Sequence, residues 1–450
     1  MFIGFDYGTS NCSVAHMLND APQLIALENG QHYLPSTLAA PTRDSVSEYL
    51  FRYCQIEPAD AVGQQLLRRA MAANREEGIE LKKEDLLFGQ AALELYLAHP
   101  QDLYYVKSPK SFLGAMGLHD VQLRFFEDLV CAMMANIKHT AEQQCQQTIT
   151  DAVIGRPINF QGSGGADSNQ QAEQILRRAA QRAGFKQIEF QFEPVAAGLE
   201  YEASLTTEQT VLVVDIGGGT TDCSLLRMGP NWRDAADRSA SLLAHSGQRV
   251  GGNDLDIYLA FHQLMPHFGL GSLLDSGLEM PMKQLWNPLA INDLSAQSEF
   301  YGQRNLAELK LLLKESQEPQ KLKRLLEVYY DTLGYSLVRR AEEAKIALSN
   351  TPNYRSSMAL ENESLSVEML FDDMVQALDV PKQQITKLVQ EAVTQADTTP
   401  DVVFMTGGSA RSPVLRQAVA EVLPQVPLVS GNDFGSVTAG LARWARVCFE

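Results

Sequence analysis

Residues 213–226 read Val-Val-Asp-Ile-Gly-Gly-Gly-Thr-Thr-Asp-Cys-Ser-Leu-Leu, an apolar run that is interrupted by a glycine-rich polar stretch and then resumes. Apolar runs on both sides of such a turn are typical of a β-hairpin. Three glycines permit positive φ angles and let backbone amides converge on an anion. Because a plain turn gains nothing from aspartates at the strand ends, Asp215 and Asp222 favour a turn that holds a ligand.

Residues 6–14 repeat this order of residue types with two fewer glycines. On that alignment Asn11 matches Asp222, and Cys12 matches Cys223. The copies lie about half a chain apart, which indicates two related lobes that each open with a glycine-turn hairpin. Chance similarity between two turns of biased composition is the alternative.

The chain has 450 residues, more than one hydrophobic core usually accommodates, so two or more lobes are expected. The net charge of −18 argues against nucleic acid or an anionic membrane as a partner. A phosphate group would therefore be held locally, by backbone amides, a metal ion or a few cations.

The six cysteines include no Cys-x-x-Cys pair, so neither a zinc site nor a redox dithiol is indicated. The N-terminus lacks a basic region followed by an apolar stretch, and no run of about 18 apolar residues occurs. We expect a cytoplasmic protein.

A carboxylate is expected at a strand-to-helix junction. Residues 168–184 predict a helix that Ser168 caps and Gly184 ends. A strand follows and stops at Glu193, and Pro194 suits the first position of the next helix. Site residues of α/β proteins collect at such junctions.

Two hairpin turns from facing lobes would clamp a polyphosphate from both sides. Hydroxyls would add hydrogen-bond donors to the backbone amides, and Asp6 and Asp215 could hold a hydrated magnesium ion. The hydroxyls are those of Thr9, Ser10, Thr220 and Thr221.

A third region suggests an adenosine site. Gly407 and Gly408 would let the backbone lie flat against a purine ring, on which Arg411 could stack. One helical face carries Glu342, Lys345 and Ser349, which could meet ribose and base edges. A merely solvated charge pattern is the alternative for that face.

Taken together, these stretches resemble the ATPase domain of the seventy-kilodalton heat-shock chaperones, within the actin-like superfamily, and most of all its short bacterial members of the YegD type. The order and rough spacing of the motifs agree from residue 1 to about residue 442. The resemblance is carried by "GFDYGTSNCSVA" and "VVDIGGGTTDCSLL" as phosphate hairpins, "EPVAAGLEY" as connecting helix, "VGGNDLD", "EEAKIALS", and "MTGGSARSP" as adenosine motif.

The resemblance implies an α/β, two-lobed actin-like ATPase fold, with duplicated sheet-and-helix lobes around a nucleotide cleft. Lobe I would comprise residues 1–190 and 435–450, with an outer subdomain at about 37–117. Lobe II would comprise residues 191–434, with an outer subdomain at about 231–340.

The resemblance also implies residue roles. Asp6 and Asp215 would organise magnesium and the attacking water, Glu193 would position that water, and Lys110 would stabilise charge on the transferred phosphoryl group, with Lys107 as a neighbouring candidate. The catalytic set would be Lys110, Glu193, Asp215 and Thr220. The nucleotide would contact Gly8, Thr9, Ser10, Asn11, Gly217, Gly218, Gly219, Thr220, Thr221, Glu342, Lys345, Ser349, Gly407, Gly408, Ser409 and Arg411.

Several family features are missing or altered. The family's linker and C-terminal peptide-binding domain find no match in the chain, so we do not expect peptide binding by the usual route. The stretch "GRPINF" at 155–160 replaces a family pattern of which only the proline and the last phenylalanine remain. Segments 37–110 and 251–342 are longer than in the family.

The leading hypothesis is a chaperone-like ATPase that binds Mg-ATP, hydrolyses it slowly and uses lobe closure as a signal, with clients or co-chaperones on the enlarged outer subdomains. A nucleotide-sensing scaffold without turnover, an actin-like filament protein and a small-molecule kinase remain alternatives. Turnover, ATP-dependent sedimentation and stimulation by one metabolite would distinguish them.

Overall fold

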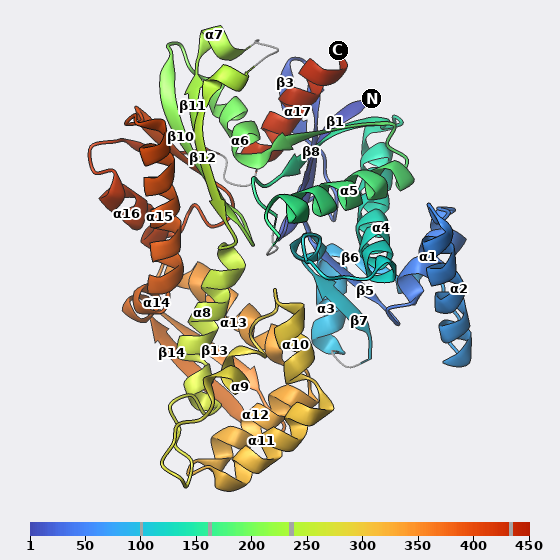
Figure 1. Cartoon of the computed structure of the whole chain (residues 1–450), viewed down its shortest axis with the longest axis vertical. Helices are drawn as coiled ribbons and strands as arrows, with labels where there is room; N and C mark the ends of the chain where they lie inside the picture. Colours follow the sequence, from blue (N-terminus) through green and yellow to red (C-terminus); the bar gives the residue numbers. More distant parts are fainter. Residues whose placement is uncertain (100–101, 161–163, 234–237, 432–434) are drawn as a thin grey trace. The chain divides into compact units, whose positions relative to one another are not determined.

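The structure of the chain, drawn in Figure 1, is a computed structural model that describes residues 1–99, 102–160, 164–233, 238–431 and 435–450. The described chain forms two compact units. The first unit contains residues 1–251, 385–410 and 418–450, and the second contains residues 252–384 and 411–417. Because the first unit contains both large sheets, the lobe boundaries predicted from the sequence stay a prediction.

The first large sheet has the strand order β3-β2-β1-β8-β9, with β4 attached to β2. β1 is antiparallel to β2 and parallel to β8. The central strands β1 and β8 are buried on both faces, as their nearly continuous apolar sequences predict. The strands are β1 (Phe2–Tyr7), β2 (Asn11–Leu18), β3 (Ala21–Leu24), β4 (Leu34–Pro35), β8 (Asp151–Arg156) and β9 (Gln187–Phe192).

The second large sheet repeats this topology in the order β12-β11-β10-β15-β16. β10 is antiparallel to β11 and parallel to β15, just as β1 is to β2 and β8. The repeat confirms the predicted duplication. The strands are β10 (Gln209–Ile216), β11 (Thr221–Met228), β12 (Leu242–Gln248), β15 (Val402–Thr406) and β16 (Leu428–Ser430).

The register of the two hairpins corrects the alignment made from the sequence. Tyr7 pairs with Cys12 in the first hairpin, and Ile216 pairs with Thr221 in the second, so each turn has the same length. Thr220 is therefore the counterpart of Asn11, and Asp222 of Ser13. The sequence alignment with two extra glycines was wrong, because it matched residue types, whereas the strand pairing gives both turns the same length.

Helices of the first unit cover these sheets and a smaller sheet of β5 (Thr37–Ala40), β6 (Leu87–Phe88) and β7 (Tyr104–Lys107). They are α1 (Ser45–Cys54), α2 (Ala61–Glu76), η1 (Lys83–Asp85), α3 (Gly89–Ala98), η2 (Pro109–Phe112), α4 (Asp120–Cys145), α5 (Ala166–Arg182), α6 (Glu193–Glu202), α7 (Pro230–Arg233), η3 (Ser239–Ser241) and α17 (Ser436–Phe449).

Two expected helix starts shift. α5 begins at Ala166 and not at Ser168, whose hydroxyl accepts a hydrogen bond from the Gly164 amide inside the first turn. α6 begins at Glu193, so that Pro194 is the second helical residue. Both starts differ by one turn or less, the usual uncertainty of a helix end.

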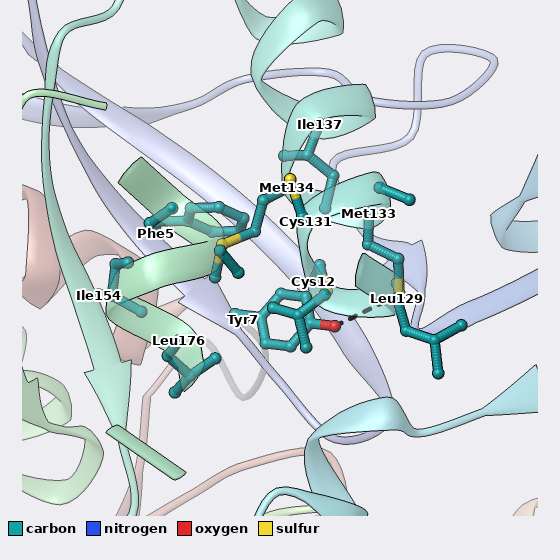
Figure 2. Close-up of a cluster of buried hydrophobic side chains, with 14 of the residues drawn as sticks. Phe5, Tyr7, Cys12, Leu129, Cys131, Met133, Met134, Ile137, Ile154 and Leu176 are labelled. Carbon is teal, nitrogen blue, oxygen red and sulfur yellow. Dashed lines mark hydrogen bonds between the residues drawn. The ribbon is translucent and has the colours of Figure 1, made fainter. Parts of the chain in front are cut away.

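The core of the first sheet lies between β1, α4 and α5, and Figure 2 shows its largest side chains. Phe5 and Tyr7 are fully buried there, and the Tyr7 hydroxyl donates to the Met133 sulfur at 3.4 Å. A fully buried side chain of this size contributes about 1.5–3 kcal/mol of transfer free energy. This packing fixes the end of β1, and with it the first turn.

The second unit is mainly helical. Its two-stranded sheet consists of β13 (Asn353–Ala359) and β14 (Ser364–Leu370). Its helices are α8 (Gly252–Gln263), η4 (Met265–His267), α9 (Met282–Trp286), α10 (Leu294–Phe300), α11 (Gln303–Glu315), α12 (Pro319–Tyr330), α13 (Gly334–Leu348) and α14 (Phe371–Ala377). The helices α15 (Asp379–Ala396) and α16 (Pro413–Val422) each contribute residues to both units.

Across the described residues, every helix is too short or too polar to cross a lipid bilayer.

Candidate functional site

The two hairpin turns meet in the first unit. The turns comprise residues 8–11 and 217–220, and the amide of Gly217 donates to the Thr220 carbonyl at 2.9 Å. A Cβ atom placed on Gly218 would lie 1.9 Å from Ser10 Oγ, so the turns are in direct contact. The structure thus brings together the two turns, whose residues 8–11 and 217–220 the sequence assigned to phosphate.

The glycines of these turns are needed for close approach and not for positive φ. Gly8, Gly217 and Gly218 all avoid the left-handed region, contrary to the sequence-based expectation. A Cβ on Gly8 would lie 2.2 Å from the Asn11 carbonyl oxygen. Any side chain at Gly8 or Gly218 would push its neighbour away.

Three aspartates lie at the bases of the two turns. Asp215 and Asp222 are opposite each other on β10 and β11 and are only 6% and 2% exposed. Burial raises the pKa of Asp6 to about 7 and that of Asp222 to about 8, with the charge of Glu193 adding to both effects. Burial likewise raises the pKa of Asp215 well above its usual value, and the Glu193, Asp222 and Asp6 charges add to the effect.

Lys110 and Glu193 form an ion pair beside these aspartates. Lys110 Nζ lies 2.5 Å from Glu193 Oε1, and the lysine is only 4% exposed. η2 supplies the lysine and the first residue of α6 supplies the glutamate. The ammonium group also lies 3.5 Å from the Gly155 carbonyl. A buried lysine held this way is not an ordinary surface lysine.

The charges of this cluster do not balance. It contains the carboxyl groups of Asp6, Glu193, Asp215 and Asp222 but the single ammonium group of Lys110. Buried carboxylates in excess must take up protons or gain a cation. The cluster is therefore suited to a ligand that brings positive charge, such as a divalent metal ion.

Magnesium fits this donor set if it keeps its water ligands. Within the described ranges, no group of three or more His, Cys, Asp or Glu side chains is arranged to bind a metal ion directly. Magnesium dehydrates reluctantly and usually binds through one or two carboxylates and substrate phosphates. The assignment of such an ion to Asp6 and Asp215 stays a prediction.

Sequence reasoning marked Asp222 as part of a ligand-holding turn but gave it no role in the site. Its carboxylate accepts the Ile158 amide at 3.1 Å and a hydrogen bond from the Thr220 hydroxyl. A Cβ on Gly247 would lie 2.3 Å from Asp222 Oδ1, so the pocket for this carboxylate is closed on several sides. The signal was present in the quoted stretch, but only the register shows that Asp222 lies opposite Asp215.

Each turn is held by a neighbouring segment, and of the two only the one at Val250 belongs to a motif quoted from the sequence, "VGGNDLD". Ser36 donates its hydroxyl to the Gly8 carbonyl at 2.7 Å and its amide to the Ser10 carbonyl at 2.9 Å. In the second hairpin the Thr221 hydroxyl donates to the Val250 carbonyl at 2.7 Å. Thr221, expected on the phosphate, is fully buried and holds the adjacent segment instead.

The turn after β15 contacts the end of β10. Gly407 has a φ of +88°, and a Cβ there would lie 2.4 Å from the Ile216 carbonyl oxygen and 2.6 Å from Asp215 Oδ1. The Ser409 amide donates to the same carbonyl at 3.3 Å. Gly407 is thus required both for its backbone conformation and for the close approach.

The chain is similar to chaperones of known families. A family profile described as "Hsp70 protein" matches residues 120–275. A "Chaperone protein HscA homolog" from Burkholderia ambifaria is 24% identical over 98% of this chain and 57% of its own length. A relative of the same name from Burkholderia cenocepacia is 25% identical over the same shares, and a "Chaperone protein dnaK" from Emiliania huxleyi is 24% identical over 99% of this chain and 60% of its own length.

This chain is similar to proteins of the Hsp70 family. Its mixed α/β architecture, with the duplicated sheets, is the actin-like ATPase fold of that family. The chain spans 57% of the length of the HscA homologues that it matches.

The Hsp70 resemblance left Lys107 as an alternative to Lys110. Lys107 is the last residue of β7, where it pairs with Thr37, whereas Lys110 is bonded to Glu193. The geometry favours Lys110 as the lysine of this cluster.

The remaining nucleotide residues assigned through the Hsp70 resemblance lie largely in the second unit. Lys345 forms an ion pair with Asp256 on α8, with 2.7 Å between Nζ and Oδ1. Glu342 accepts from Arg339 at 2.8 Å, and the Ser349 hydroxyl donates to the Lys345 carbonyl at 2.9 Å. Arg411 is exposed in the same unit, and Gly408 is exposed in the first. Their role in binding adenosine stays a prediction.

Proposed function

We propose that this Hsp70-like chain binds Mg-ATP at its two hairpin turns and hydrolyses it slowly, as a chaperone-type ATPase. The observation that carries the proposal is the buried Lys110–Glu193 ion pair, which lies among Asp6, Asp215 and Asp222 beside the contacting turns. The chaperone names of the HscA and DnaK relatives support it.

Each part of the cluster has a task in phosphoryl transfer, which depends mainly on positioning and electrostatic stabilisation. The amides and hydroxyls of residues 8–11 and 217–220 would hold the phosphates. Lys110 would stabilise the negative charge of the transferred phosphoryl group. Glu193 would accept a hydrogen bond from the attacking water and so orient it.

The aspartates would complete the site. Asp6 and Asp215 would hold the water ligands of magnesium, which when bound neutralises part of the phosphate charge. With that charge present, their carboxyl groups would lose the protons that burial otherwise keeps on them. Asp222 would keep the second turn in place through Thr220 and Ile158.

Opening and closing of the protein around nucleotide would be its output, serving protein folding or refolding. Clients or co-chaperones would bind the enlarged outer segments, and the protein would act in the cytoplasm. These parts of the proposal rest on the family and on the sequence composition.

The test is single-turnover hydrolysis of Mg-ATP at matched nucleotide occupancy. Removal of the water-orienting carboxylate in Glu193→Gln should slow turnover by roughly 10²–10⁴-fold, and Lys110→Ala and Asp215→Asn should slow it by at least about 10²-fold. Glu189→Gln is the matched control, since Glu189 is exposed on β9, four residues before Glu193.

Loss in the three site variants with an unchanged control would support the ATPase. Tight binding of Mg-ATP without turnover by the unmodified chain would contradict it and favour the nucleotide-sensing scaffold. Equal losses in Glu189→Gln would show that the variants disturb folding and not chemistry.

A further inference from the structure

Helix α2 of this acidic chain presents an exposed row of arginines. Every residue of its outer face is exposed: Ala61, Gln64, Gln65, Arg68, Arg69, Ala72, Arg75 and Glu76. These positions recur every three or four residues, so they form one continuous stripe along the helix. Three of them are arginines, although the whole chain carries a net charge of −18.

The three arginines have no acidic partner. Within the described part of the chain, none of Arg68, Arg69 and Arg75 forms an ion pair or a hydrogen bond through its guanidinium group. No Asp or Glu lies three or four residues from any of them on α2.

Several helices of this chain pair a partly exposed cation with a carboxylate one helical turn away. Lys138 lies 2.7 Å from Glu142 on α4, and Arg446 lies 3.0 Å from Glu450 at the end of α17. Arg339 lies 2.8 Å from Glu342 on α13. Arg68, Arg69 and Arg75 lack such a carboxylate on α2.

α2 is mounted rigidly, which preorganises the stripe. Asp60 caps the helix by accepting the Gly63 amide at 2.9 Å and also lies 2.6 Å from Arg124 Nη2 on α4. Near the other end, the buried Asn74 donates to Glu48 on α1 at 2.6 Å. Figure 1 shows α1 and α2 beside α4. A surface held in one conformation loses little entropy when a partner binds.

We propose that the α2 stripe, the exposed face defined by Arg68, Arg69, Ala72 and Arg75, docks an acidic helical segment of a partner protein. Arg68 and Arg75 are two helical turns apart, about 10 Å, which matches carboxylates seven residues apart on a second helix. Ala72 between them leaves room for close helix packing.

Other partners fit the stripe less well. Nucleic acid would place many phosphates near a chain of net charge −18, and three arginines offset few of them. Membrane binding would need large apolar residues on the same face, but the exposed apolar residues of α2 are Ala61 and Ala72. An acidic segment needs only local complementarity. The proposal is independent of the ATP site.

The test is a fluorescence anisotropy titration of the full chain with a labelled 21-residue helical peptide that carries glutamates at successive spacings of three and four. The triple variant Arg68→Glu, Arg69→Glu, Arg75→Glu should weaken binding by at least about tenfold, because like charges then face each other. The conservative variant with lysine at all three positions should bind within about threefold of the unmodified chain, since it keeps the charge.

A matched control reverses Arg304, Lys314 and Lys323, which are exposed in the second unit and change the net charge equally. Circular dichroism checks folding, and a triple glutamine variant repeats the test with a smaller charge change. Absence of peptide binding, an equal loss in the control variant, or tighter binding of a 20-base-pair DNA duplex than of the peptide would each overturn the proposal.

Discussion

Asp222 shows how one residue acquires its role from the register of a hairpin. Its counterpart in the first hairpin is Ser13, which is equally buried but uncharged and bonds to Thr438 at 2.6 Å. Asp222 instead brings a third aspartate to the cluster of Asp6 and Asp215, and burial raises its pKa to about 8. The two hairpins share a backbone, but the second carries more charge.

The raised pKa values predict a stability that falls as pH rises in the nucleotide-free protein. The pKa of Asp6 is raised from 3.8 to about 7, and that of Asp222 from 3.8 to about 8. Between each pair of values, the native state keeps a proton on the carboxyl group that the unfolded chain has released. Each such proton lowers the free energy of unfolding by about 1.4 kcal/mol per pH unit. Asp222→Asn should flatten the dependence, as measured by urea unfolding at pH 5 and pH 8.5.

The exposed Asp167 provides the matched control for this prediction, since Asp167→Asn removes a carboxylate without touching the cluster. If the free energy of unfolding of Asp222→Asn depended on pH as steeply as that of the unmodified chain, the raised pKa of Asp222 would be contradicted.

At the scale of elements, α17 packs against α6, the helix that carries Glu193. α6 begins with Glu193, and its Ala196 carbonyl lies against Gly440 of α17. A Cβ at Gly440 would lie 1.7 Å from that carbonyl oxygen, so the two helices approach each other backbone to backbone. Because the obstacle is main chain, no rotamer change can relieve the clash.

Gly440→Ala should therefore destabilise the protein, although glycine to alanine in an open helix stabilises it by about 1 kcal/mol. We expect a loss of at least about 1–3 kcal/mol from overpacking, measured by denaturant unfolding. Gly198→Ala in α6 is the comparison, because there the nearest obstacle is the flexible end of Met228, 2.2 Å from the added Cβ. If Gly440→Ala lowered the free energy of unfolding no more than Gly198→Ala, this would show that α6 and α17 can move apart without cost.

For the whole molecule, the division into two units has a thermodynamic consequence. The chain leaves the first unit after residue 251 and returns at 385, so the second unit is largely an insertion. The smaller unit buries a smaller fraction of its surface, and such units are less stable. Unfolding of the full chain should not be two-state.

Tryptophan fluorescence can separate the two units. Trp286 belongs to the second unit, where it packs 5.1 Å from Tyr258, while Trp232 and Trp444 belong to the first. The double variant Trp232→Phe, Trp444→Phe retains Trp286 and reports the second unit. The double variant Trp232→Phe, Trp286→Phe retains Trp444 and reports the first unit. The thermal midpoint of the first variant should be the lower one. Coincident midpoints, each equal to that from far-ultraviolet circular dichroism, would show one cooperative molecule.

The sequence by itself determined the features that depend on local pattern. The glycine turn at 217–219, its copy at residue 8 and the carboxylate at Glu193 are all where the structure has them, because apolar periodicity and turn chemistry act over a few residues. The ordered motifs led to the family. For residues 263–330 the sequence predicts a peripheral subdomain with a helical tail but not the separate helices α11 and α12, because no clear apolar period distinguishes them.

Only the tertiary structure decided which residues meet. The register that places Asp222 opposite Asp215 comes from pairing between strands, and the Lys110–Glu193 pair joins residues 83 positions apart. The raised pKa values and the unpaired stripe on α2 come from burial and exposure. A sequence pattern specifies neither, because each results from the packing of distant segments against one another.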